Sequence, residues 1–221
     1  MIHFKDLQEG LYDPNIFKAF FLAGGPGSGK SYVVRRTTGG LGLKVVNSDP
    51  TFTKMLKDAN LSLKMPASEK EPREIQRQRA KELTKKQQQN FIMGRLGLII
   101  DGTGKDYEKI TYQARELEQL GYDTYMIFVN TSLDVALERN AKRDRSVPES
   151  MVIKLWNQVQ SNIGKFNLFF KQGFIIVDNN DAKQDILDLV YKRVKQLLRV
   201  PIRNTRAKEW MRMELLKKQQ R

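Results

Sequence analysis

Short apolar runs alternate with amphipathic segments along most of this 221-residue chain. Each run is four to eight residues long and rich in aliphatic or aromatic side chains, which is typical of strands buried inside a sheet. The predicted strands cover residues 16–23, 43–47, 96–100, 124–129 and 174–177.

The segments between these runs have the spacing of amphipathic helices, and glycine follows several of them. The predicted helices cover residues 32–38, 51–58, 73–93, 107–120, 133–139, 149–163, 182–198 and 206–219. Strands that alternate with helices predict an α/β fold, in which a doubly wound, parallel, five-stranded sheet carries helices on both faces. We expect one domain over residues 1–201 and a basic C-terminal helical tail over 202–221.

In such a fold the ligand site lies at the carboxyl ends of the strands, and the first strand leads directly into a glycine-rich motif. The motif matches G-x-x-x-x-G-K-[ST] in full and reads Gly24-Gly25-Pro26-Gly27-Ser28-Gly29-Lys30-Ser31. Its glycines let backbone N–H groups surround phosphate oxygens, and the following helix N-terminus favours the same anion. Lys30 can reach the β- and γ-phosphates of ATP, and the Ser31 hydroxyl can coordinate Mg²⁺.

Asp49 follows the second predicted strand, directly before Pro50. A carboxylate at this edge can accept the proton of an attacking hydroxyl group, or orient that hydroxyl in line with the γ-phosphate. The structural alternative is that Asp49 caps the next helix, with Pro50 in its first position. One residue can do both, and we favour the catalytic interpretation.

Asp101 ends the third predicted strand and is followed by Gly102, Thr103 and Gly104. An acidic residue at the end of an apolar strand is typical of a carboxylate that holds Mg²⁺ in phosphate-loop proteins. Thr103 is a second polar group in this position, directed at a phosphate or at the acceptor. The structural alternative is that Asp101 only orders the turn.

A basic segment over residues 139–148 separates two predicted helices and contains Arg139, Arg143 and Arg145. Arginines placed there suit a lid that closes over ATP and neutralises the charge on the transferred phosphoryl group. The alternative is a solvated run of charges. The lid interpretation is favoured because the segment follows the fourth strand and its helix, from which it can fold over the phosphate loop.

Composition excludes some chemistry and suggests anionic partners. The chain has no cysteine, which excludes disulfides, thiolate zinc sites and cysteine nucleophiles and indicates a cytoplasmic setting. No apolar run reaches the roughly 18 residues of a membrane span. The formal net charge is +14 and attracts polyanions such as nucleic acid. Residues 202–221 hold seven basic and two acidic residues, and both a solvated helix and a functional basic arm fit them.

The motifs GGPGSGKS, VVNSDP, LIIDGTG and RNAKRDRSVPE occur in this order. Together they resemble the zeta-toxin-like and polynucleotide-kinase-like P-loop kinases, over about residues 16–177. The resemblance implies a sheet in the order 2-3-1-4-5, ATP and Mg²⁺ as cofactors, Asp49 as the acceptor-activating base, and Arg143 and Arg145 as lid groups. It also implies an antidote protein as a partner if the chain is a toxin.

Two functions remain open at this stage. The first is an ATP-dependent kinase that phosphorylates a hydroxyl of a nucleic acid, a nucleotide or a sugar nucleotide. The basic stretch over residues 64–86 could line the acceptor groove, although it offers no aromatic side chain on which bases could stack. The second is a nucleic-acid-binding ATPase that acts as a switch or assembly factor, against which stands the lack of a glutamate beside Asp101 to activate water.

Overall fold

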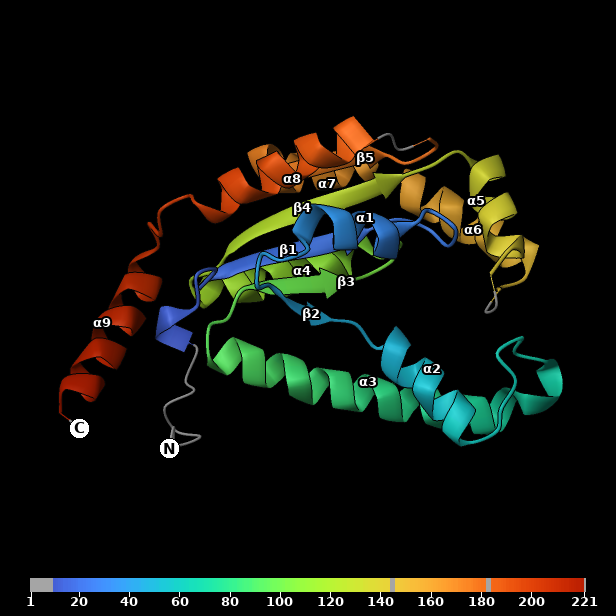
Figure 1. Cartoon of the computed structure of the whole chain (residues 1–221), viewed down its shortest axis with the longest axis horizontal. Helices are drawn as coiled ribbons and strands as arrows, with labels where there is room; N and C mark the ends of the chain where they lie inside the picture. The colour runs from blue at the N-terminus through green and yellow to red at the C-terminus, as the bar shows by residue number, and fades with distance from the viewer. Residues whose placement is uncertain (1–9, 144–145, 182–183, 221) are drawn as a thin grey trace.

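The computed structural model describes residues 10–143, 146–181 and 184–220. Within these ranges the strands are β1 (Lys18–Ala23), β2 (Lys44–Val46), β3 (Leu98–Asp101), β4 (Asp123–Asn130) and β5 (Phe174–Asp178). They form one parallel sheet in the order β2-β3-β1-β4-β5, drawn in Figure 1. This arrangement confirms the predicted fold class and the strand order that the resemblance implied.

The central strand, β1, pairs with both β3 and β4. All six of its residues are buried, and the five from Ala19 to Ala23 are apolar, as expected for a parallel strand covered on both faces. The first residue, Lys18, is a buried cation paired with Asp123. Its register places Leu22 opposite Asp101 of β3 and opposite Ile127 of β4. The ends of these three strands therefore meet at one edge of the sheet.

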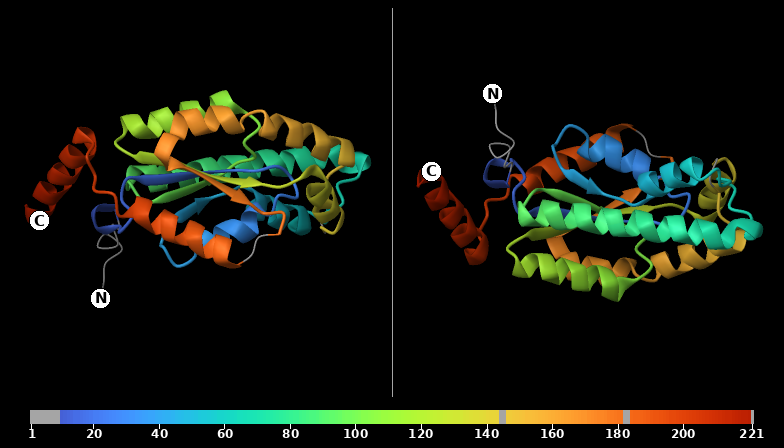
Figure 2. Two further views of the ribbon diagram at one scale, coloured as in Figure 1. Left: turned by 90° about the horizontal axis from the view of Figure 1, so that it is seen from above. Right: turned by 90° about the horizontal axis from the view of Figure 1, so that it is seen from below.

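Helices cover both faces of the sheet, as the two views of Figure 2 show. The helices of the described ranges, on the faces and around them, are α1 (Lys30–Thr38), α2 (Asp49–Asp58), α3 (Lys70–Met93), α4 (Tyr107–Gln119), α5 (Leu133–Ala141), α6 (Glu149–Gln160), α7 (Ile163–Phe170), α8 (Gln184–Leu198) and α9 (Thr205–Gln219). A core on one face packs α1 and α8 against Phe20 and Leu22. A core on the other face packs α4, α6 and α7 against Phe21 and Phe128. No helix in the described ranges is long and apolar enough to cross a membrane.

The pair α2 and α3 stands beside β2 and has an apolar cluster of its own. Phe52, Leu56 and Ala80 are its buried members, and the guanidinium of Arg77 lies 4.5 Å from the centre of the Phe52 ring. Figure 1 shows α3 running past β2, with its N-terminal end on the side where the strands end. The pair therefore stands beside that edge, and α3 carries seven basic and three acidic residues.

One helix was not predicted from the sequence. We expected a single helix over residues 149–163, whereas α6 ends at Gln160 and a separate helix, α7, follows. The chain turns at Asn162, whose side chain is buried and donates to the backbone oxygens of Gly104 and Lys105, both at 3.0 Å. The spacing of Phe166, Phe169 and Phe170 in the sequence is that of a helix face and could have indicated α7.

The first half of α9 packs against the opposite end of the sheet from α5 and α6 (Figure 1). The Trp210 ring lies edge-on to Phe17, and Phe17 lies edge-on to Tyr122, with ring centres 5.5 Å apart in both pairs. Ala207 is fully buried, and a side chain at Gly121 (φ 104°) would begin 2.8 Å from the Ala207 Cβ. Close aromatic and small-residue packing thus joins α9 to the sheet.

We expect Trp210→Ala to lower the free energy of unfolding by about 2 kcal/mol, because it removes a large, partly buried ring from this contact. Met213→Ala, on the exposed side of the same helix, is the matched control and should cost under about 0.5 kcal/mol. Urea unfolding followed by circular dichroism measures both. Equal losses for the two variants would contradict the packing role of Trp210.

Candidate active site

The glycine-rich loop between β1 and α1 is closely packed against its neighbours. Gly27 has a φ of 78°, and a Cβ added there would lie 2.1 Å from the backbone oxygen of Ala136. Gly29 has a φ of 80° and would place a Cβ 2.3 Å from Asn179 Nδ2. Both positions require glycine for the backbone angle and for space. The loop therefore has the form of a phosphate cradle at the N-terminus of a helix.

Lys30 begins α1 and turns back over the loop. Its Nζ donates to the backbone oxygen of Gly24 at 2.6 Å. Burial lowers the pKa of Lys30, the carboxylates of Asp101 and Asp49 oppose this shift, and the charge of Arg143 adds to it. A buried cation is costly without a counterion, so this ammonium group is suited to an anion such as a phosphate.

Two acidic residues face Lys30 from the ends of neighbouring strands. Asn47 Nδ2 donates to Asp101 Oδ2 at 2.7 Å, and Asn47 Oδ1 accepts from the backbone N–H of Asp49 at 2.8 Å. Asn47 therefore joins the two predicted site residues. Helix α2 begins at Asp49 itself, so the capping position belongs to Ser48 and not to Asp49.

The surroundings of the Asp101 carboxyl group disfavour its charged form. Burial raises its pKa, Lys30 opposes the shift, and the charge of Asp49 adds to it. Its Oδ1 is buried and has no hydrogen-bond partner within the described part of the chain. A carboxylate oxygen left in this state is suited to a metal ion or to a water held by one.

The loop after β3 lies against the phosphate cradle. The backbone oxygen of Thr103 accepts from Gly24 N–H at 2.9 Å. The next two residues, Gly104 and Lys105, accept hydrogen bonds from the Asn162 side chain. On α6, the indole N–H of Trp156 donates to the backbone oxygen of Thr131 at 2.8 Å, just after β4. Residues on and just after α6 therefore hold the loops that follow β3 and β4, next to the candidate site.

The three arginines of the basic segment have separate positions. Arg139 lies on α5 and donates to the backbone oxygens of Asn179 and Asn180, at 2.7 and 3.1 Å. Arg143 lines the pocket over the cradle. Arg145 lies outside the described residues, so its predicted role has no structural account.

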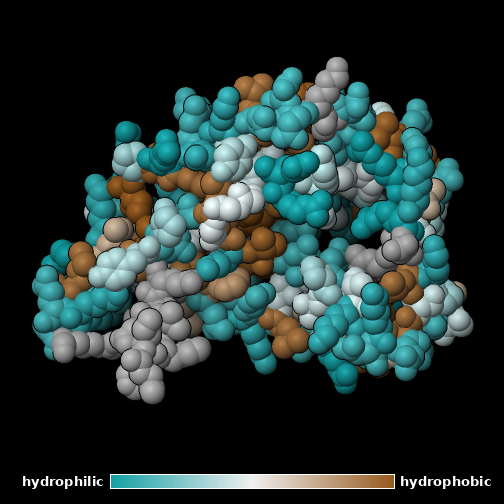
Figure 3. All heavy atoms as spheres, in the orientation of Figure 1, coloured by the Kyte–Doolittle hydropathy of each residue, from teal (hydrophilic) through white to brown (hydrophobic). Residues whose placement is uncertain are grey.

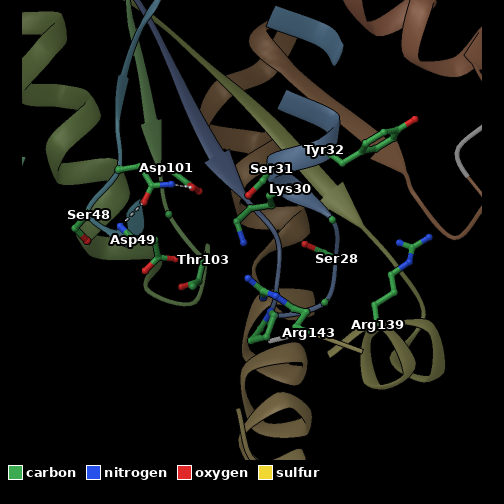
Figure 4. A pocket seen from close by; sticks show the side chains of 16 residues that line it. Ser28, Lys30, Ser31, Tyr32, Ser48, Asp49, Asp101, Thr103, Arg139 and Arg143 are labelled. Atoms are coloured by element: carbon green, nitrogen blue, oxygen red, sulfur yellow. Dashed lines mark hydrogen bonds between the residues drawn. The ribbon is translucent and has the colours of Figure 1, made fainter. Parts of the chain in front are cut away.

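These groups surround one cavity of about 480 Å³ at the carboxyl edge of the sheet. Figure 3 shows a hollow in the hydrophilic surface on this side, and Figure 4 shows its lining. Asp49 and Asp101 lie on one side of Lys30, whereas Tyr32 and Arg139 lie on the other. The lining comprises residues 25–32, Asn47, Ser48, Asp49, Asp101, Gly102, Thr103, Arg139 and Arg143.

The lining fits a nucleoside triphosphate with a divalent ion. The cradle and Lys30 supply N–H donors and positive charge for phosphates. Ser31 and Asp101 supply the hard oxygen donors that Mg²⁺ prefers, alongside the phosphate oxygens of a nucleotide. The buried, unpartnered Asp101 Oδ1 is the observation that favours a metal ion over a purely structural role for this residue.

The family comparison agrees with this geometry. The zeta toxin family model matches residues 9–188, most of the chain. The chain belongs to the zeta toxin family. A search of curated proteins gives no match. For this zeta toxin family member, the family and the P-loop kinase fold together support a phosphotransferase, without naming its acceptor.

Three solved structures share the fold. A candidate kinase from Chloroflexus aurantiacus j-10-fl has a TM-score of 0.56 at 15% identity, covering 81% of this chain and 97% of its own. A gluconokinase from Sinorhizobium meliloti 1021 has a TM-score of 0.52 at 14% identity, covering 83% and 94%. A chain of the Pnkp1/Rnl/Hen1 RNA repair complex has a TM-score of 0.53 at 21% identity, covering 68% and 46%. At these identities the likeness establishes the fold alone.

Sequence reasoning missed several polar residues around the pocket of this zeta toxin family member. Asn47 and Asn179 each follow a strand at the functional edge, so the rule that places ligand sites at strand ends could have found them. Tyr32 follows the motif directly and lines the pocket. Asn162 lies between two helices, and nothing in its local pattern indicated its contact with the loop after β3.

The raised pKa of Asp101 predicts how its contribution to stability changes with pH. The unfolded chain loses this proton at lower pH than the folded chain, so the group destabilises the folded state increasingly as pH rises through that window. In nucleotide-free and metal-free protein, we therefore expect the stability gained by Asp101→Asn over wild type to grow from acidic to neutral pH.

Urea unfolding across this pH range measures the difference in the free energy of unfolding between wild type and Asp101→Asn. Asp58→Asn, at the exposed end of α2, is the control. A difference between wild type and Asp101→Asn that shrinks as pH rises would contradict the raised pKa of Asp101.

Proposed function

We propose that this protein transfers the γ-phosphoryl group of ATP to a hydroxyl group of an anionic acceptor, with Asp49 as the base. The observation that carries the proposal is the charge arrangement in one pocket. A partly buried lysine in a glycine cradle faces two carboxylates that come from the ends of different strands. Phosphoryl transfer needs such positioning and electrostatic stabilisation more than covalent chemistry from the protein.

The different residues at the two ends of the pocket determine which way round the nucleotide binds. Phosphates occupy the cradle at the start of α1, within reach of Lys30 and Ser31. The γ-phosphate points to the side of Asp49 and Asp101, and the base lies toward Tyr32 and Arg139. Mg²⁺ held by Ser31 and Asp101 would neutralise charge on the phosphates.

The reaction follows from this placement. The acceptor oxygen forms a bond to the γ-phosphorus as the bond from that phosphorus to the β–γ bridging oxygen breaks, which leaves ADP. The acceptor hydroxyl proton passes to the Asp49 carboxylate. Lys30 and Arg143 stabilise the charge that spreads over the transferred group. Thr103, on the same side of Lys30 as Asp49, orients the acceptor or a phosphate oxygen.

The acceptor enters beside α2 and α3. Residues 64–86, which include all the basic side chains of α3, carry eight basic and four acidic residues, a net charge of +4. This excess favours an acceptor with a phosphate or another negative group. A nucleic acid, a nucleotide and a sugar nucleotide all meet this requirement, and labelling separates them.

The decisive measurement follows γ-labelled phosphate from ATP with Mg²⁺ into separate pools of 5′-hydroxyl oligonucleotides, nucleosides and nucleotides, and sugar nucleotides. We expect label in one pool. Lys30→Ala should abolish transfer, because it removes the cation from the cradle. Asp49→Asn should stop transfer and leave ATP affinity within about twofold, because the base acts on the acceptor.

Asp58→Asn, the exposed acidic residue at the other end of α2, is the control for Asp49 and should transfer label as wild type does. Full activity in Asp49→Asn would refute the base assignment. Label released only as free phosphate, most strongly with nucleic acid present, would instead identify an ATPase that acts as a switch.

Arg143→Ala should lower kcat by up to about 10³-fold with a smaller effect on the KM for ATP, because its charge is needed most in the transition state. Lys142→Ala is the matched control, since Lys142 is exposed and paired with Glu138 on the same helix turn. Steady-state kinetics with the labelled acceptor compare the two. Equal rates for both variants would leave Arg143 as a surface charge.

A further inference from the structure

The two residues that follow β5 contact both ends of the nucleotide pocket. Asn179 is 4% exposed, and its Nδ2 donates to the backbone oxygen of Ser28 in the cradle at 2.6 Å. Its own backbone N–H donates to Asn130 at the end of β4, at 2.8 Å. Asn179 therefore links the rigid sheet directly to the phosphate loop.

Asn179 also packs against the turn that joins the phosphate loop to α1. The side-chain nitrogen of Asn179 lies 2.3 Å from the position that a Cβ of Gly29 would take. Gly29 is the last loop residue before Lys30 and has a φ of 80°. The contact holds this turn, and with it the direction in which the first N–H groups of α1 point.

The neighbouring asparagine has different partners. Asn180 Oδ1 accepts from the backbone N–H of Ser132 at 2.6 Å, and Asn180 Nδ2 donates to Asp178 at 2.8 Å. The backbone oxygens of both asparagines accept from Arg139, at the end of the pocket assigned to the base. The Asn179 side chain thus contacts the cradle directly, and the Arg139 guanidinium lies beside it, with Nη1 3.7 Å from the position that a Cβ of Gly29 would take.

We propose that Asn179 is a positioning residue that shapes the phosphate cradle. The inference rests on the proposed nucleotide site. It implies that Asn179 acts on any ligand with a polyphosphate, whether or not that ligand carries a base. Inorganic tripolyphosphate, which has no base, isolates this contribution.

Calorimetric titration with ATP and with tripolyphosphate, both in Mg²⁺, tests the proposal on wild type and Asn179→Ala. Asn179→Ala leaves the buried Ser28 oxygen without this donor, and we expect it to weaken both ligands by a similar factor of about ten. Asn167→Ala, on the exposed side of α7, is the control and should change neither affinity.

Asn179→Asp preserves the volume of the side chain and replaces the donor by an acceptor that faces the Ser28 oxygen. It should weaken both ligands at least as much as alanine does, and it provides the test if the alanine variant fails to fold. Thermal melting of the ligand-free variants checks that each is folded at the titration temperature.

The outcomes separate this inference from the function on which it rests. Wild-type affinity for both ligands in the folded Asn179 variants would overturn the inference alone. Loss of ATP binding with unchanged tripolyphosphate binding would also overturn it, because Asn179 would then act on the base. Binding of neither ligand by wild type would overturn the nucleotide site itself, and the proposed function with it.

Discussion

Burial of β1 on both faces of the sheet is the constraint on which the rest of the structure depends. Each of its six residues is buried, so the strand cannot shift its register without exposing apolar surface or burying polar groups. The chain therefore leaves the sheet at one defined point, and the glycine cradle begins there. The paired ends of β3 and β4 bring Asp101 and the residues before α5 to the same edge.

The candidate site has a balance of charges that suits binding an anion. Lys30 is partly buried, which lowers its pKa, and the nearby carboxylates of Asp101 and Asp49 limit this shift. Asp101 is partly buried as well, and Lys30 limits the rise in its pKa. Each charge partly offsets the cost of burying the other. A phosphate with a metal ion would complete this set, and the proposed phosphoryl transfer rests on this balance.

Membership of the zeta toxin family and the shared P-loop kinase fold agree on the class of chemistry and leave the acceptor open. Function within such folds depends on the residues around the site rather than on the sheet. In this chain the pocket is lined, beyond the cradle, by Asn47 and Asp49 before and at the start of α2, by the loop after β3 and by Arg143.

The sequence by itself determined the order of strands and helices and the position of the phosphate loop, because periodicity and a contiguous motif are local properties. It also singled out Asp49 and Asp101, since each directly follows an apolar strand. Only the tertiary structure decided the contacts from Asn47 to Asp101 and from Asn179 to Ser28, whose partners are 54 and 151 residues apart. It also decided that Arg139 contacts the loop after β5. Such pairings depend on how the sheet brings strand ends together, which no local pattern records.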